Sequence, residues 1–241
     1  MKKLLFIINP MAGRQQAQTD LYKMVKIFAD HDYEVTVYPT RARLDCTRKV
    51  LEDAGRFDLV VCCGGDGTLN EMVSGMMQRQ DRRPMGYIPL GSTNDLAVSL
   101  RLPTRVEEAA LRAVTGNEFH MDVGTLNDRY FNYIAAFGAF TETSYATPQE
   151  IKNALGHLAY ILEGVKSLGK ILPIHVKITA DDEQFEEDYL FGAVTNTISL
   201  GGVLKLDPEK VLLDDGMYEL LLVKNPTNAL EAQAMLTAIM T

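Results

Sequence analysis

The pentapeptide GGDGT at residues 64–68 places one acid, Asp66, among three glycines. It follows an apolar run at residues 59–63 and precedes a helical pattern at residues 68–79. Glycine is costly in folding entropy, so this cluster indicates a tight turn or a ligand that approaches the backbone closely. The free N–H groups and positive end of the following helix suit a phosphate group. A carboxylate fits there if Mg²⁺ or an acceptor hydroxyl lies between Asp66 and the phosphate.

Three further loops are expected beside this one. The first half of the sequence alternates strand and helix patterns, which indicates a parallel sheet with helices on both faces. In such sheets the ligand site lies at the carboxyl ends of the strands. The strand ends at residues 9–13, 39–40, 64–68 and 91–95 would share that edge, where Asp95 supplies a second carboxylate. The alternative is that the glycines only form turns and that both acids are helix caps.

Several classes of nucleotide-binding enzyme are excluded by their motifs. The sequence has no G-x-x-x-x-G-K-[ST] loop of the P-loop enzymes, and GGDGT lacks the G-x-G-x-x-G spacing of the dinucleotide fingerprint. It also lacks the H-R-D and D-F-G motifs of protein kinases. The four histidines are scattered without the spacing of metal ligands.

Composition narrows the expected partners. The net charge of -8 over 241 residues argues against broad binding of nucleic acid, and against adhesion to anionic lipid by charge alone. No apolar run approaches the roughly 18 residues of a transmembrane helix, and the run before Asn9 is too short for a signal peptide. The three cysteines lack metal-type spacing and fit a reducing compartment. We therefore expect a cytoplasmic protein without a transmembrane segment.

The pattern changes near residue 118. Strands are predicted around a turn at Asn127, in a hairpin at residues 173–197 and at residues 216–224, with helices at residues 148–168 and after Pro226. The sequence therefore predicts an α/β nucleotide-binding domain at residues 1–118, followed by a β-rich domain at residues 119–241.

Three segments resemble the nucleotide-site motifs of the diacylglycerol kinase catalytic family: NPMAG at residues 9–13, GGDGTLNE at 64–71 and PLGSTNDLA at 89–97. This family includes bacterial diacylglycerol kinases and the sphingosine and ceramide kinases. The segments NYIAAFGAFTETSY, ALGHLAYILEG and DDGMYELLLVKNP are similar to second-domain segments of its soluble bacterial members. GGDGT alone also occurs in NAD kinases and phosphofructokinases, but the ordered set spans the whole chain.

The resemblance implies an α/β domain, a β-sandwich domain and an ATP site in the cleft between them. It implies Asp66 and Asp95 as catalytic residues that help position Mg·ATP, together with Asp122. Ser92 stands where the family usually has threonine and keeps the hydroxyl. The implied nucleotide-binding residues are Asn9, Pro10, Met11, Ala12, Gly13, Thr40, Gly65, Asp66, Gly67, Thr68, Leu69, Asn70, Glu71 and Ser92.

The resemblance also implies a structural Mg²⁺ in the second domain. Its ligands would be the side chain of Asp215 and the carbonyls of Leu212 and Met217. The alternative for this segment is a plain turn before a strand.

The expected function is an ATP- and Mg²⁺-dependent lipid kinase that transfers the γ-phosphoryl group to a lipid hydroxyl, converting diacylglycerol to phosphatidate. The lipid would be contacted transiently at the membrane surface. The alternatives are an NAD kinase and a non-catalytic nucleotide-binding protein.

The sequence ends in NALEAQAMLTAIMT, a predicted helix that leads on to further strands in the family. Those strands carry a Gly-Glu segment whose glutamate is the family's proposed general base. Without them, exposed sheet edges invite pairing with another chain. We therefore expect either a fragment of a longer protein or a weak enzyme that associates, for example as a homodimer.

Overall fold

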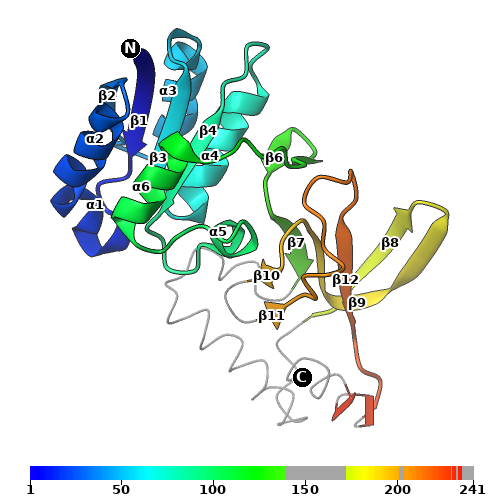
Figure 1. Cartoon of the computed structure of the whole chain (residues 1–241). Coiled ribbons are helices and arrows are strands. Elements are labelled where there is room, and N and C mark those ends of the chain that lie inside the picture. The colour runs from blue at the N-terminus through cyan, green and yellow to red at the C-terminus, as the bar shows by residue number, and fades with distance from the viewer. Residues whose placement is uncertain (139–171, 201–203, 229, 232, 235–241) are drawn as a thin grey trace.

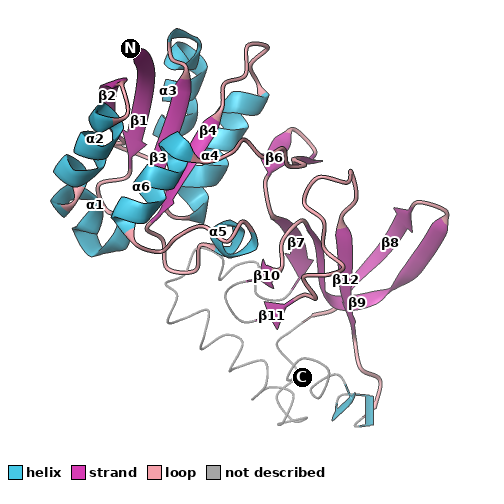
Figure 2. Cartoon of the chain, in the orientation of Figure 1, coloured by secondary structure: helices cyan, strands magenta, loops and turns pink. Residues whose placement is uncertain are grey.

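In the computed structural model the chain forms an α/β region followed by a region made mostly of strands (Figures 1 and 2). The structure describes residues 1–138, 172–200, 204–228, 230–231 and 233–234. The first region consists of β1 (Lys2–Ile8), η1 (Ala12–Gln15), α1 (Gln16–Thr19), α2 (Leu21–Asp30), β2 (Tyr33–Pro39), α3 (Asp45–Asp53), η2 (Ala54–Arg56), β3 (Leu59–Gly64), α4 (Asp66–Met77), β4 (Met85–Pro89), α5 (Asp95–Ser99) and α6 (Val106–Thr115). The second region consists of β5 (Gly124–Leu126), β6 (Arg129–Phe131), β7 (Ile134–Gly138), β8 (Ile174–Ala180), β9 (Glu183–Thr195), β10 (Ser199–Leu200), β11 (Leu204–Lys205) and β12 (Glu219–Lys224).

The first region is built on a parallel sheet with the strand order β2-β1-β3-β4. β1 pairs in parallel with β2 and β3, and β3 also pairs in parallel with β4. Because all four strands run in one direction, the loops that follow them lie at the same edge of the sheet. This arrangement confirms the predicted fold class for the first half of the chain.

Helices cover both faces of this sheet, so its central strands are apolar along their length. Leu4 and Phe6 of β1 point into a core shared with α2 and α6, where the ring of Phe6 meets Phe28 edge to face at 5.2 Å. Leu5 and Ile7 point into the opposite core, which contains buried residues of α3, α4 and α5. The two cores fix the sheet between its helix layers and thereby fix the strand-end loops.

The helices differ from the sequence pattern in three places. Leu21, Val25 and Phe28 recur at helical spacing between residues 15 and 30, but a break at Asp20 divides this stretch into α1 and α2. α4 begins at Asp66 rather than at Thr68, so the predicted catalytic acid lies in the first turn of the helix. α6 was not predicted, and it buries Val106 and two alanines against the sheet.

The second region contains antiparallel sheets, as predicted. β9 lies at the centre of the larger sheet: its first half pairs with β8, and its second half pairs with β7 and β12. β5 pairs with β6 around the predicted turn at Asn127, and β10 pairs with β11. The predicted domain boundary at residue 118 falls between α6 and β5 and stays a prediction. The predicted helix at residues 148–168 lies outside the described residues, and those described at 230–231 and 233–234 are helical.

Close packing of α3 on α4 depends on Gly75. A Cβ atom at this position would lie 2.9 Å from the carbonyl oxygen of Thr47 and 2.9 Å from Cβ of Val50. By contrast, a Cβ atom at Gly67 in the same helix would meet nothing within 4 Å. Helix packing therefore requires glycine at position 75, whereas no neighbouring atom excludes a side chain at position 67.

We expect Gly75→Ala to lower the free energy of unfolding by about 1–3 kcal/mol, because the added methyl group overpacks the contact with α3. Gly67→Ala is the matched control: its free energy of unfolding should be unchanged or rise by up to about 1 kcal/mol, since alanine favours the helix. Urea titrations of both variants check this. Equal effects of the two substitutions would contradict the packing role of Gly75.

Candidate functional site

A cavity of about 600 Å³ opens where β1, β2 and β3 end. The predicted nucleotide-binding residues that line it are Asn9, Pro10, Met11, Thr40, Gly67, Thr68 and Glu71. Its lining also includes Arg41, Ala42 and Arg43, which the sequence analysis did not identify. The loops after β1, β2 and β3, three of the four predicted to share this edge of the sheet, therefore border one open cavity.

Asn9 holds the first loop against the start of α4. Its backbone N–H donates to the carbonyl of Cys63 at 2.9 Å, which keeps the end of β1 beside β3. Its side-chain oxygen accepts from the backbone N–H of Met11 at 3.0 Å, and its amide donates to Oγ1 of Thr68 at 3.4 Å. Further along the loop, Gly13 has φ +59°, a left-handed conformation that favours glycine. Asn9 thus shapes this wall of the cavity.

The loops after β3 and β4 touch through two glycines. A Cβ atom on Gly91 would lie 2.5 Å from the Cα of Gly65, so this approach requires glycine at position 91. Asn94 closes the second loop: its side chain accepts from the N–H of Gly91 at 2.8 Å and donates to the carbonyl of Gly91 at 2.9 Å. Tyr87 donates its hydroxyl to the same side-chain oxygen of Asn94 at 3.1 Å. This contact places the loop that carries Thr93 beside Asp66.

The two carboxylate oxygens of Asp66 differ in their hydrogen bonds. Thr93 donates its hydroxyl to Oδ2 at 3.1 Å, whereas Oδ1 is buried and has no hydrogen-bond partner among the described residues. Burial raises the pKa of Asp66 and the negative charge of Asp95 raises it further, against the hydrogen bond from Thr93 and the backbone N–H groups of Asn94 and Leu96, which lower it. A buried carboxylate oxygen without a partner is costly, and a cation or a hydroxyl proton would satisfy it.

Asp95 has a different environment. Only 2% of its surface is exposed, and its Oδ1 accepts from the hydroxyl of Ser199 at 2.7 Å. The two predicted catalytic acids therefore lie near each other, but Asp95 is buried against the second region, whereas Asp66 keeps an unsatisfied oxygen. Tyr133 of the second region is also close, because the charges of Asp66 and Asp95 add to the effect of burial that raises its pKa.

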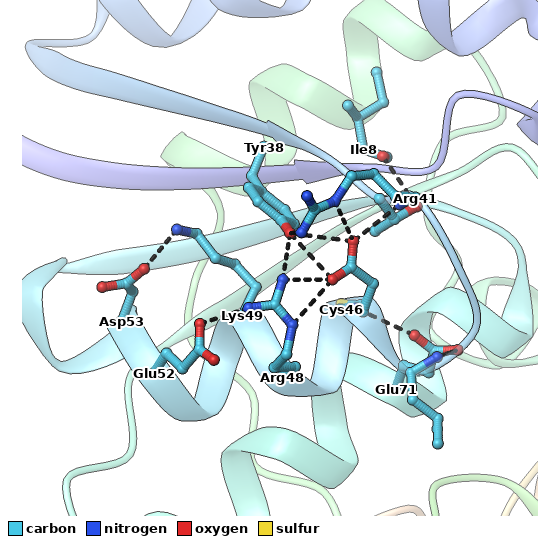
Figure 3. A network of polar contacts seen from close by, with 12 residues as sticks. Ile8, Tyr38, Arg41, Cys46, Arg48, Lys49, Glu52, Asp53 and Glu71 are labelled. Atoms are coloured by element: carbon cyan, nitrogen blue, oxygen red, sulfur yellow. Dashed lines mark hydrogen bonds and ion pairs between the residues drawn. The ribbon is translucent and has the colours of Figure 1, made fainter.

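Glu71 uses its carboxylate to hold the loop after β2. Oε1 accepts from the N–H of Leu44 at 2.8 Å, and Oε2 accepts from the N–H of Cys46 at 3.3 Å (Figure 3). Both N–H groups belong to the start of α3, where a negative charge is favourable. Glu71 lines the cavity, but its carboxylate already binds the protein backbone, and its role in nucleotide binding stays a prediction.

A polar network holds the basic residues beside the cavity. The carboxylate of Asp45 is buried and accepts from Arg48 at 2.6 Å, from the Tyr38 hydroxyl at 3.0 Å and from the backbone N–H of Arg41 at 2.9 Å. Arg48, the hydrogen bond from Arg41 and that from Tyr38 together hold the pKa of Asp45 well below its usual range, against the effect of burial. Figure 3 shows Arg41 and Arg48 directed toward Tyr38. The hydrogen bond from the backbone of Arg41 to Asp45 therefore fixes the beginning of the loop at residues 40–44.

The remaining predicted residues are divided between core and surface. Ala12 and Leu69 are buried, Ser92 is exposed, and Oδ1 of Asn70 is buried without a hydrogen-bond partner among the described residues. Sequence reasoning missed Thr93 as a partner of Asp66, although it lies inside the quoted motif.

The predicted metal ligands of the second region lie in a turn. Oδ1 of Asp215 accepts from the N–H of Met217 at 2.9 Å, and Oδ2 of Asp122 accepts from the N–H of Gly216 at 2.7 Å. Across the described residues, we find no group of three or more His, Cys, Asp or Glu side chains placed to hold a metal ion. A site of one carboxylate and the carbonyls of Leu212 and Met217 stays a prediction.

Asp66→Asn should stabilise the ligand-free protein increasingly as pH rises. The folded-state pKa of Asp66 is raised, so the contribution of Asp66 to the stability of the wild type is fully present below its unfolded pKa and is lost as pH rises through its folded pKa. The amide does not ionise, so the variant avoids this loss. Thermal unfolding without nucleotide or Mg²⁺, from about pH 4 to about pH 8, checks this prediction. A difference in melting temperature that does not change with pH would contradict the raised pKa.

Comparison with known proteins identifies the family. The sequence model described as "Diacylglycerol kinase catalytic domain" matches residues 3–126. The chain is 37% identical to the diacylglycerol kinase of Bacillus subtilis (strain 168) over 226 residues, which cover 93% of this chain and 74% of that protein. It is 32% identical to the diacylglycerol kinase of Staphylococcus saprophyticus over 224 residues, which cover 92% of this chain and 73% of that protein.

Solved structures agree with this assignment. A crystal structure of a candidate diacylglycerol kinase from Bacillus anthracis str. Sterne superposes with a TM-score of 0.81 at 30% identity, covering 99% of this chain and 78% of that one. A crystal structure of a diacylglycerol kinase from the same strain gives a TM-score of 0.77 at 28% identity, covering 100% of this chain and 78% of that one. Every helix among the described residues is too short or too polar to cross a bilayer. The chain therefore belongs to the diacylglycerol kinase catalytic family and is a lipid kinase.

Proposed function

We propose that this lipid kinase transfers the γ-phosphoryl group of ATP, in the presence of Mg²⁺, to the free hydroxyl of diacylglycerol. The observation that carries the proposal is the buried Oδ1 of Asp66, which lacks a hydrogen-bond partner among the described residues and lies in the first turn of a helix beside the cavity. In the reaction, the lipid oxygen bonds to the γ-phosphorus and the bond from that phosphorus to the bridging oxygen of ADP breaks. The hydroxyl proton leaves, and the products are phosphatidate and ADP.

The strand-end loops would bind the triphosphate. The first turn of α4 offers backbone N–H groups and the positive end of the helix, and Gly67 leaves open space above them. Arg41 and Arg43 add positive charge at the rim of the cavity, in a protein whose net charge is -8. Local basic residues are needed because the overall charge of the protein repels a nucleotide.

Asp66 and Asp95 would act at the phosphoryl group that is transferred. When bound, Mg²⁺ neutralises part of the negative charge of the phosphoryl group during its transfer. The unsatisfied oxygen of Asp66 is suited to hold the hydrated cation or to accept the proton of the lipid hydroxyl. These two roles share one atom, so Asp66 is the residue on which the proposal depends.

The lipid would be taken from the membrane surface during a transient contact made by a cytoplasmic protein. The negative net charge makes long-lived electrostatic adhesion to anionic lipid unfavourable. Nucleic acid is not an expected partner, and association into a homodimer is part of the proposal to be tested by sedimentation.

The test is a panel of acceptors with radiolabelled ATP. Diacylglycerol, sphingosine and ceramide in mixed micelles, and NAD in solution, are each incubated with the protein with and without Mg²⁺. We expect labelled phosphatidate from diacylglycerol, and only when Mg²⁺ is present. Label on NAD would support an NAD kinase instead, and ATP binding without transfer to any acceptor would support a non-catalytic protein.

Asp66→Asn should reduce phosphoryl transfer by about 10²–10⁴-fold and leave ATP binding nearly unchanged. Gly67→Ala should have the opposite pattern, because its methyl group enters the space left for phosphate. Its affinity for ATP should fall by about tenfold or more, which corresponds to about 1.4 kcal/mol. Calorimetric titration with ATP and initial rates measure both effects. Normal transfer by folded Asp66→Asn would refute the assignment of this carboxylate.

Asp215 is proposed to ligate a structural Mg²⁺ with the carbonyls of Leu212 and Met217. We expect Asp215→Ala to lower the melting temperature and to remove its dependence on Mg²⁺ in the absence of nucleotide. Asp214→Ala is the matched control, because it removes an adjacent acid outside the proposed ligand set. If both variants kept the Mg²⁺ response, the segment would be a plain turn.

A further inference from the structure

The two regions are joined by buried hydrogen bonds between α5 and the segment that leads into β10. Figure 1 shows α5 beside β10, although about a hundred residues separate them in the sequence. We call the residues that make these bonds the polar seam: Asp95, Ser99, Thr197, Ile198 and Ser199.

The residues of the seam are buried and closely hydrogen-bonded. Asp95, Thr197 and Ser199 have 2%, 0% and 3% of their surfaces exposed. The hydroxyls of Ser99 and Thr197 are 2.6 Å apart, and the Ser99 hydroxyl accepts from the N–H of Ile198 at 3.0 Å. Because buried polar groups are costly to leave unpaired, this arrangement fixes the orientation of each member.

Two serines of the seam contact Asp95 in different ways. Ser199 donates to the carboxylate oxygen Oδ1 at 2.7 Å. Ser99 donates to the backbone carbonyl of Asp95 at 3.2 Å. The bond from Ser99 to Asp95 lies within α5, and Ser99 supports the junction through Thr197 and Ile198 instead. Only the bond from Ser199 reaches the Asp95 carboxylate across the junction.

We infer that Ser199 is a positioning residue for phosphoryl transfer: the second region uses its hydroxyl to set the orientation of the Asp95 carboxylate beside Asp66. The inference rests on the proposed function, since it assigns the acid pair to the transfer step. The nucleotide cavity is lined by the loops after β1, β2 and β3, and neither Asp95 nor Ser199 belongs to its lining. Loss of the Ser199 hydroxyl should therefore reduce kcat and leave the KM for ATP unchanged.

The first experiment compares Ser199→Ala with Ser99→Ala in the full chain. We expect Ser199→Ala to lower kcat by about tenfold, with the KM for ATP within about twofold of wild type, since the variant loses the hydrogen bond that Ser199 donates to the charged Asp95 carboxylate. Ser99→Ala should lower the melting temperature to a similar degree and keep kcat. Equal losses of kcat in the two variants would show that Ser199 acts only through the stability of the junction and would overturn the inference.

The second experiment is a double-mutant cycle with Asp95→Asn. If Ser199 acts through the Asp95 carboxylate, adding Ser199→Ala to Asp95→Asn should cause no further loss of kcat. Losses that multiply would mean that Ser199 acts elsewhere and would overturn the inference. All rates are compared with those of the wild type on whichever acceptor it phosphorylates. Failure of the proposed function would therefore appear as an absence of wild-type transfer, and failure of this inference as a wrong pattern among active variants.

Discussion

The site depends on the close approach of two backbone segments at Gly65 and Gly91. A side chain on Gly91 would collide with Gly65, so glycine allows the loops after β3 and β4 to touch. Through this contact Thr93 reaches Asp66, and α5 begins close enough for the charge of Asp95 to affect it. The glycines therefore differ in what they permit: Gly65 and Gly91 allow two loops to touch, whereas Gly67 leaves open space beside the cavity.

The two acids that share this edge are held in different ways. Asp95 is bonded to Ser199 and buried, so its orientation depends on the second region. Asp66 belongs to the first region and keeps a buried oxygen without a partner among the described residues, at a cost in stability. A site of this kind gives up stability of the empty protein in return for interaction with its ligand.

The sequence predicted what depends on local pattern. Strand and helix alternation predicted the parallel sheet, and the strand ends predicted most of the cavity lining, because the carboxyl ends of parallel strands must lie together. It did not predict that Glu71 caps α3, that Arg41 lines the cavity or that Ser199 bonds to Asp95. These facts depend on contacts between residues far apart in the sequence, which no local period reveals. α6 was also not predicted, although Val106, Ala109 and Ala110 recur at helical spacing and pack against the sheet.

The separation of Asp95 and Ser199 along the chain has a consequence for biosynthesis. Their hydrogen bond spans 104 residues, whereas every loop that lines the cavity lies before residue 72. At about 5–20 residues per second, a ribosome adds Ser199 roughly 5–20 s after Asp95. All residues that line the cavity are therefore translated before either member of this hydrogen bond. The acid pair of the proposed site would be completed last, when the second region has been translated and its Ser199 hydroxyl reaches the Asp95 carboxylate.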